Sequence, residues 1–96
     1  MFAVISRLKI KPGAVDEVGQ IVQSKVIPEA SQLPSFHHYY AIRTGDDSAT
    51  AITLWDTQAG VEAHMQQVAK LVQQHAGSLI ISVERESGEV TLEAGK

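Results

Sequence analysis

Strand-like and helix-like hydrophobic periods alternate along this chain, and their order constrains the fold more than any other feature of the sequence. Residues 2–10 place apolar side chains at every second position, and Ser6 is the polar break in that face. A period of two predicts a β-strand with one buried face. Pro12 and Gly13 follow directly and end the strand.

The next segment changes to a helical period. Asp16 and Glu17 suit the first turn of a helix, where acidic side chains meet the positive end of the helix dipole. Apolar positions then recur at three- and four-residue spacing and predict a buried stripe made of Val15, Val18, Val22, Val26, Ala30 and Leu33. Pro28 lies inside this stripe, so we expect the helix to bend or split there, and Pro34 to end it.

Two further strands follow the first helix. Residues 36–43 are rich in aromatic side chains and predict the second strand. The polar residues 45–48 have the composition of a hairpin loop, and residues 49–55 predict the third strand. These two strands are therefore expected to pair with each other.

The last third of the chain predicts a second helix and a fourth strand. Asp56 or Thr57 can cap the helix, because their side-chain oxygens accept hydrogen bonds from free backbone N–H groups. Gly77 is expected to end it in the left-handed conformation. Residues 79–86 predict the fourth strand, and residues 87–88 predict a turn after it.

The resulting order, β-α-β-β-α-β, predicts one α+β domain of the ferredoxin-like type over residues 1–96. Both helices should cover the same face of an antiparallel sheet. The opposite face would carry Ile5 and Ala41 and would be too apolar for open water, so we expect a second sheet to pack on it. We therefore predict a twofold homodimer, in which a short tail strand at residues 90–92 reaches the partner.

Composition excludes several function classes. The chain lacks cysteine, which rules out disulfides and thiolate metal sites, and its four histidines have no clustered acid, so no metal site is expected. A net charge of −3 with scattered basic residues argues against nucleic acid as a partner. No run has the length of a membrane span, and no membrane partner is expected. Because the N-terminus lacks a signal-peptide pattern, a cytoplasmic location is the default expectation.

The segment from Trp55 to His64 joins a strand end, the only tryptophan and a titratable helix side chain. Trp55 is either an aromatic wall of a substrate pocket or a filler of the core. His64 is the candidate catalytic residue, as a general base or a stabiliser of an anion; alternatively it is a structural histidine. His75 shares its helix face but lies eleven residues further on, about 16 Å along the axis, which is too far to act with it.

Three more residues are candidates for lining a substrate pocket. His37 and His38 are adjacent on a strand and must point to opposite faces. His38 shares a face with Tyr40 and is expected to face the helices, whereas Tyr39 is expected to face the other side. His38 and Tyr40 would either hydrogen-bond a substrate oxygen or pack as buried aromatics. Ser6 either points into the pocket or is tolerated in the core.

Nearly the whole chain resembles the antibiotic biosynthesis monooxygenase family of the dimeric α+β barrel superfamily. The resemblance rests on four segments, residues 9–13, 27–29, 34–36 and 54–64. Trp55 and His64 match the aromatic residue and the helix histidine that family members often carry. Thr53 stands where many relatives have an acid, and Ser35 where many have glycine.

The resemblance implies a homodimer with a pocket between helices and sheet in each subunit. Relatives oxidise electron-rich phenols or quinols with O2 and without a bound cofactor, so we expect a cofactor-independent monooxygenase acting on a small aromatic molecule. The alternative is a non-catalytic dimeric module that binds or senses a small molecule. Haem degradation, a third activity among relatives, needs an axial histidine, a tryptophan and an asparagine. His75 is placed for the first, but His64 and Ser6 stand where the other two belong.

Overall fold

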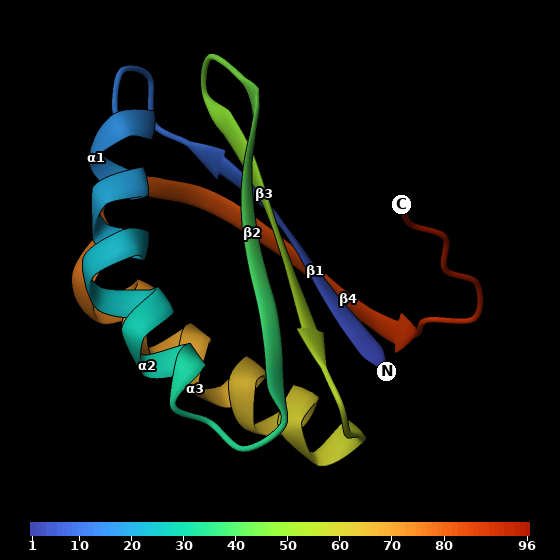
Figure 1. The fold of residues 1–96 in the computed structure, drawn as a ribbon. Coiled ribbons are helices and arrows are strands. Elements are labelled where there is room, and N and C mark those ends of the chain that lie inside the picture. The colour runs from blue at the N-terminus through green and yellow to red at the C-terminus, as the bar shows by residue number, and fades with distance from the viewer.

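The computed structural model describes residues 1–96 and consists of a four-stranded sheet with the helices on one face (Figure 1). The strands are β1 (Phe2–Ile10), β2 (Phe36–Gly45), β3 (Ser48–Trp55) and β4 (Ile80–Glu89), in the spatial order β2-β3-β1-β4. Every neighbouring pair is antiparallel. Helical segments join β1 to β2 and β3 to β4, so the predicted ferredoxin-like α+β fold is confirmed.

The first helical region is split, as Pro28 predicts. The helix α1 (Val15–Ile21) passes into a π-helical turn, η1 (Val22–Val26), and then into α2 (Ile27–Ser31). Pro28 stands at the start of α2, where its missing N–H leaves no intrahelical bond unmade. The wider turn of η1 absorbs the break in the α-helical bonding pattern. The chain therefore stays helical on both sides of the proline.

The helix α3 (Gln58–Ala76) begins at Thr57, one of the two caps predicted. The Thr57 hydroxyl oxygen accepts a hydrogen bond from the Gly60 backbone N–H at 3.1 Å. Gly60 has no room for a side chain, because a Cβ atom there would lie 1.9 Å from Ser35 Oγ and 3.2 Å from Trp55 Cε3. This glycine lets the helix start directly against the tryptophan. Although α3 is the longest helix, no helix of the protein is both long and apolar enough to cross a membrane.

Two predictions for the end of the chain are wrong. Gly77 keeps right-handed backbone angles, φ −57° and ψ −33°, because the chain continues into a further turn in which the Leu79 N–H donates to the Ala76 carbonyl oxygen at 2.9 Å. Ser87 and Gly88 form no turn, since β4 continues through them and pairs with the start of β1. A turn at this point would leave backbone groups of β1 without partners.

A β-bulge in β2 reverses the predicted facing of its aromatic side chains. Between Phe36 and His38, β2 gains one residue relative to β3. Phe36 and Tyr39 therefore both pack toward the core, although they are three residues apart. A one-residue slip moves every later side chain to the other face of the sheet. His38 and Tyr40 consequently point away from the helices, and the prediction that they face them is wrong.

The hydrophobic core lies at one end of the sheet, where β3 runs into α3. Its fully buried members are Val4, Ala30, Trp55 and Val61. The Trp55 ring is 0% exposed, and its indole N–H donates to Thr53 Oγ1 at 2.8 Å, so its polar group is satisfied. Of the two roles predicted for Trp55, the packing supports that of a core filler.

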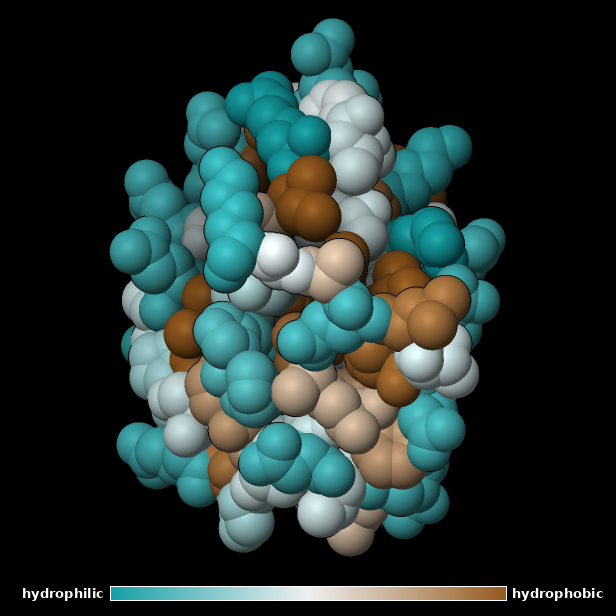
Figure 2. All heavy atoms as spheres, turned by 45° about the vertical axis from the view of Figure 1, so that its right-hand side comes forward, coloured by the Kyte–Doolittle hydropathy of each residue, from teal (hydrophilic) through white to brown (hydrophobic).

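The face of the sheet away from the helices carries apolar side chains among hydrophilic ones (Figure 2). Tyr40 is 49% and Ile42 is 43% exposed, and the half-buried Ile52 of β3 and Ile5 of β1 follow Tyr40 across the sheet. Ala41 does not belong to this face, because the bulge turns it toward the helices, where it lines a cavity. Residues 90–92 form no strand within the single chain.

Candidate functional site

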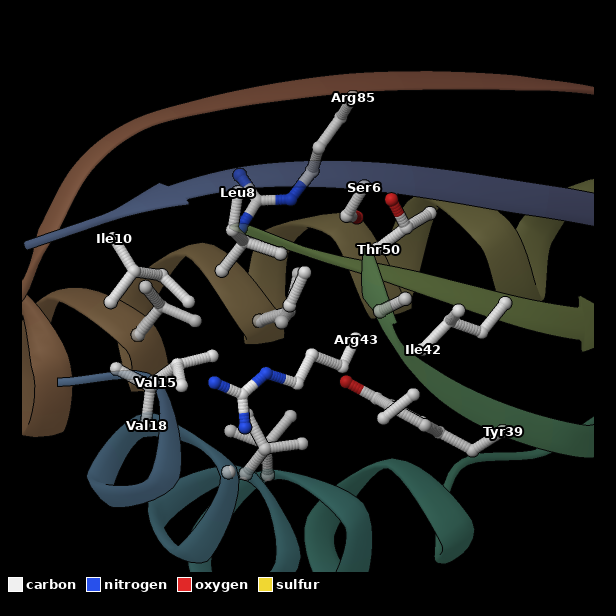
Figure 3. A pocket seen from close by; sticks show the side chains of 18 of the residues that line it. Ser6, Leu8, Ile10, Val15, Val18, Tyr39, Ile42, Arg43, Thr50 and Arg85 are labelled. Atoms are coloured by element: carbon white, nitrogen blue, oxygen red, sulfur yellow. The ribbon is translucent and has the colours of Figure 1, made fainter. Parts of the chain in front are cut away.

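A cavity of about 250 Å³ lies beside the core, between the inner face of the sheet and the helices (Figure 3). Its floor consists of small side chains from three strands: Ser6, Ala41, Ala49 and Ala51. Ala51 pairs with both Ser6 and Ala41, so these small residues are neighbours across the sheet. Valines of the helical segments form the opposite wall: Val15, Val18, Val22, Val26, Val68 and Val72. The cavity exists because the floor residues are too small to fill the space beneath the helices.

His64 reaches this cavity from α3 and is 2% exposed. Its ring stacks on Trp55 with centroids 4.8 Å apart, and Tyr39 meets it edge-on with centroids 6.3 Å apart. Burial, and secondarily the positive charge of Arg85, lower the pKa of His64 from 6.5 to about 4. The imidazole is therefore neutral at pH 7, and its buried Nδ1 has no hydrogen-bond partner.

Tyr39 contributes a protonated phenol to the same cavity. Burial raises the pKa of Tyr39 from 10.0 to about 12, although the nearby Arg85 cation acts in the opposite direction. Figure 3 shows the Tyr39 hydroxyl directed into the space between the sheet and α1. At neutral pH this hydroxyl is a hydrogen-bond donor to whatever occupies the cavity.

The half-buried Arg85 brings a positive charge to the end of the cavity nearest β4, which is called the inner end because Arg85 is less exposed than Arg43 at the other end. It stands opposite Ser6 in the pairing of β4 with β1, and its side chain points inward (Figure 3). Burial lowers the pKa of Arg85 while Tyr39 offsets this, and the guanidinium remains a cation at pH 7. Its Nε is buried without a partner. The only acid that lines the cavity, Asp16, has a side chain that is 90% exposed at the mouth, so the inner charge is uncompensated.

The structure brings together only part of the site predicted from the sequence. His64 and Ser6 both line the cavity. Trp55 does not reach it and instead supports the His64 ring from behind. His38 and Tyr40 lie on the other face of the sheet, where their rings stack with planes 2° apart and centroids 5.7 Å apart. They cannot hydrogen-bond a molecule held in this cavity.

Tyr39 and Arg85 line the cavity although the sequence did not indicate either as a site residue. The segment around Arg85 is strongly polar, and the only signal for an inward position is its two-residue spacing from Val83. For Tyr39 the alternation pointed to the wrong face, because nothing in the sequence marks the bulge before it. His75, which was set apart from His64 by distance, does not line the cavity.

A ferredoxin-like sheet with an apolar cavity beneath its helices, lined by two arginines, defines the class of small α+β proteins with an interior cavity. Residues 1–78 match the family model described as antibiotic biosynthesis monooxygenase. The chain therefore belongs to the antibiotic biosynthesis monooxygenase family. No curated protein matches the chain in sequence.

Solved structures with the same fold are distant in sequence. The protein of unknown function NE2512 from Nitrosomonas europaea is 24% identical, with a TM-score of 0.80, over 98% of this chain and 95% of that one. SnoaB from Streptomyces nogalater, a cofactor-independent oxygenase crystallised as a point mutant, is 17% identical, with a TM-score of 0.81, over 99% and 97%. A point mutant of MhuD, solved with two manganese protoporphyrins per active site, is 17% identical with a TM-score of 0.78, and each chain is covered completely. These likenesses show the fold.

Proposed function

We propose that this protein is a cofactor-independent monooxygenase that binds a small aromatic phenol or quinol in the cavity and oxidises it with O2. The observation that carries the proposal is the uncompensated Arg85 cation beside the unpaired Nδ1 of His64, at the inner end of an apolar cavity. An aromatic ring suits the valine walls, and its phenolate suits the guanidinium. SnoaB, which shares the fold, is a cofactor-independent oxygenase, and this supports the same class of reaction.

The residues around the cavity suggest how the anion forms. The phenol loses its proton to Nδ1 of His64, while Arg85 stabilises the phenolate oxygen and the Tyr39 hydroxyl donates a hydrogen bond to it. The low pKa of His64 in the empty cavity makes it a weak base there. The bound phenolate raises that pKa by its negative charge, so the base gains strength only when substrate is present.

The electrons come from the substrate itself. The substrate anion passes an electron to O2, and the two radicals then combine. For an anthrone, the ring CH2 group becomes a carbonyl: one oxygen atom enters the product and the other leaves as water. The substrate thus supplies all four electrons that O2 accepts, and the protein's part is to bind, orient and stabilise the anion.

Oxygen uptake with a panel of anthrones and hydroquinones tests the proposal. We expect turnover by the native protein, and a loss of about a hundredfold or more for Arg85→Gln, since one electrostatic contact to a developing charge is worth about 3 kcal/mol. Lys70→Gln removes an exposed positive charge from α3 and serves as the matched control. If no compound is turned over, the enzyme assignment is wrong. Ligand-induced shifts in the melting temperature without turnover would instead support the binding module.

We further propose that a second copy of the chain packs on the outer face of the sheet. The exposed Tyr40 and Ile42 and the half-buried Ile5 form an apolar surface there, which a twofold partner would bury. Analytical ultracentrifugation at micromolar concentration should give the mass of a dimer. A monomer at that concentration would contradict this assembly.

A further inference from the structure

The cavity has an arginine at each end, and only the inner one is needed to stabilise a phenolate. Arg43 lines the cavity from β2, and Arg85 lines it from β4. These strands are the two edges of the sheet, so three strand spacings, about 14 Å, separate their backbones. Figure 3 shows both side chains extending inward from these opposite edges. A ligand long enough to fill the cavity meets both guanidinium groups.

Arg43 is held in place but weakly paired. Its Nε donates to the Gly45 carbonyl oxygen at 3.3 Å, which anchors the side chain to the hairpin. Its Nη1 lies 3.5 Å from Asp16 Oδ1, and the two side chains are 57% and 90% exposed. An exposed ion pair of this kind contributes little free energy. A ligand carboxylate that makes two parallel hydrogen bonds to the guanidinium would compete successfully with Asp16.

The surroundings of Arg43 favour an anionic group over a neutral one. Apart from Asp16, no acid lines the cavity, and the side chains that face Arg43 from α1 are Val15 and Val18 (Figure 3). A neutral ring at this position would displace water from the guanidinium and offer no partner in return. A carboxylate would replace the lost water with a charge-assisted pair.

We infer that Arg43 is a specificity-determining residue, which selects aromatic substrates that carry a carboxylate at the end of the ring system remote from the phenol. This inference rests on the proposed function, because it takes the phenol end to lie at Arg85. The substrate class is thereby narrowed to fused aromatic hydroxy acids. Arg43 takes no part in the oxidation itself and acts on binding and orientation.

A pair of ligands that differ only in the carboxylate tests this assignment. Binding of 6-hydroxy-2-naphthoate and of 2-naphthol is measured by fluorescence titration with the native protein, Arg43→Gln, Asp16→Asn and Arg85→Gln. The native protein should bind the hydroxy acid about tenfold more tightly than the naphthol. Arg43→Gln should abolish this preference by weakening the binding of the hydroxy acid and not that of naphthol, which should bind at least as tightly once the guanidinium no longer has to lose water. Asp16→Asn should strengthen the preference by removing the competing carboxylate.

The outcomes separate this inference from the proposed function. If both ligands bind the native protein equally, the inference is overturned while the aromatic pocket stands. A preference that survives in Arg43→Gln but disappears in Arg85→Gln would mean that the carboxylate lies at the inner end, which also overturns it. If neither ligand binds, the cavity holds no aromatic molecule of this size, and the inference fails together with the proposed function. Circular dichroism of each variant verifies that its fold is intact.

Discussion

Replacing His64 with glutamine should remove about 3 kcal/mol of pH dependence from the free energy of unfolding between pH 7 and pH 4. The pKa of His64 is lowered from 6.5 to about 4 in the fold, chiefly by burial and then by Arg85. A shift of one pKa unit corresponds to about 1.4 kcal/mol, so the lowering of the His64 pKa from 6.5 to about 4 amounts to about 3 kcal/mol. For a domain with a total stability of about 5 to 15 kcal/mol, this is a large fraction.

The sign follows from proton binding. Between pH 6.5 and about pH 4 the unfolded chain protonates this imidazole while the folded chain keeps it neutral. The unfolded state therefore binds more protons, and the free energy of unfolding rises with pH across this window. The contribution of His64 is complete above pH 6.5, is lost as the pH falls, and changes no further below about pH 4. Glutamine has no titrating group, so the His64→Gln variant should lack this component.

Urea denaturation followed by circular dichroism, at several pH values from about 4 to 7, measures the effect. His75→Gln, which replaces a histidine on the same helix but outside the cavity, is the matched control. An NMR titration of the His64 ring gives its pKa directly, even if the variant folds poorly. An identical slope in His64→Gln and the native protein, or a His64 pKa close to 6.5, would refute the argument that burial suppresses the imidazolium.

Three further changes test the packing. Thr57→Ala removes the cap of α3 and should lower the free energy of unfolding by about 1 kcal/mol in urea melts. Gly60→Ala forces a Cβ atom against Ser35 Oγ and should cost about 1 to 3 kcal/mol, whereas Gly19→Ala, with nothing within 4 Å, should raise stability; a loss of similar size in both would contradict the close approach at Gly60. Ala51→Leu enlarges the cavity floor and should abolish 2-naphthol binding without lowering the melting temperature; unchanged binding would mean that the ligand site lies elsewhere.

The order and type of the elements could be predicted because burial imposes a period on each of them. Pro28 also predicted the split of the first helix, because a residue without a backbone N–H removes a helical hydrogen bond wherever it stands. The bulge in β2 left no such mark. This strand carries four amphipathic rings in a row, at residues 37–40. Either His37 with Tyr39 or His38 with Tyr40 could face the helices, and only the register with β3 decides which pair does.

The site was harder to predict than the fold because its parts are individually ordinary in the sequence. The floor of the cavity comes from Ser6, Ala41, Ala49 and Ala51, which are scattered over three strands and become neighbours only through strand pairing. Arg85 lies between two glutamates in a polar segment, so it reads as an exposed residue. Of the groups that matter, only His64 carries its own signal, because an inward helix position rarely holds a titratable ring.

Large side chains fill one end of the space between the sheet and the helices, and small side chains leave a cavity at the other end. At one end, the rings of Phe36 and Trp55 meet edge-on at 5.5 Å, and the space between sheet and helices is filled. At the other end, alanines and a serine leave a cavity of about 250 Å³, which larger aliphatic residues at the same positions would close with a gain in buried area. The half-buried Arg85, whose Nε is buried without a partner, and the unpaired Nδ1 of His64 add a further cost to the free energy of folding. An anionic aromatic molecule in the cavity would lower both costs, so the small floor residues and the unpaired polar groups fit the proposed function better than they fit a role in stability.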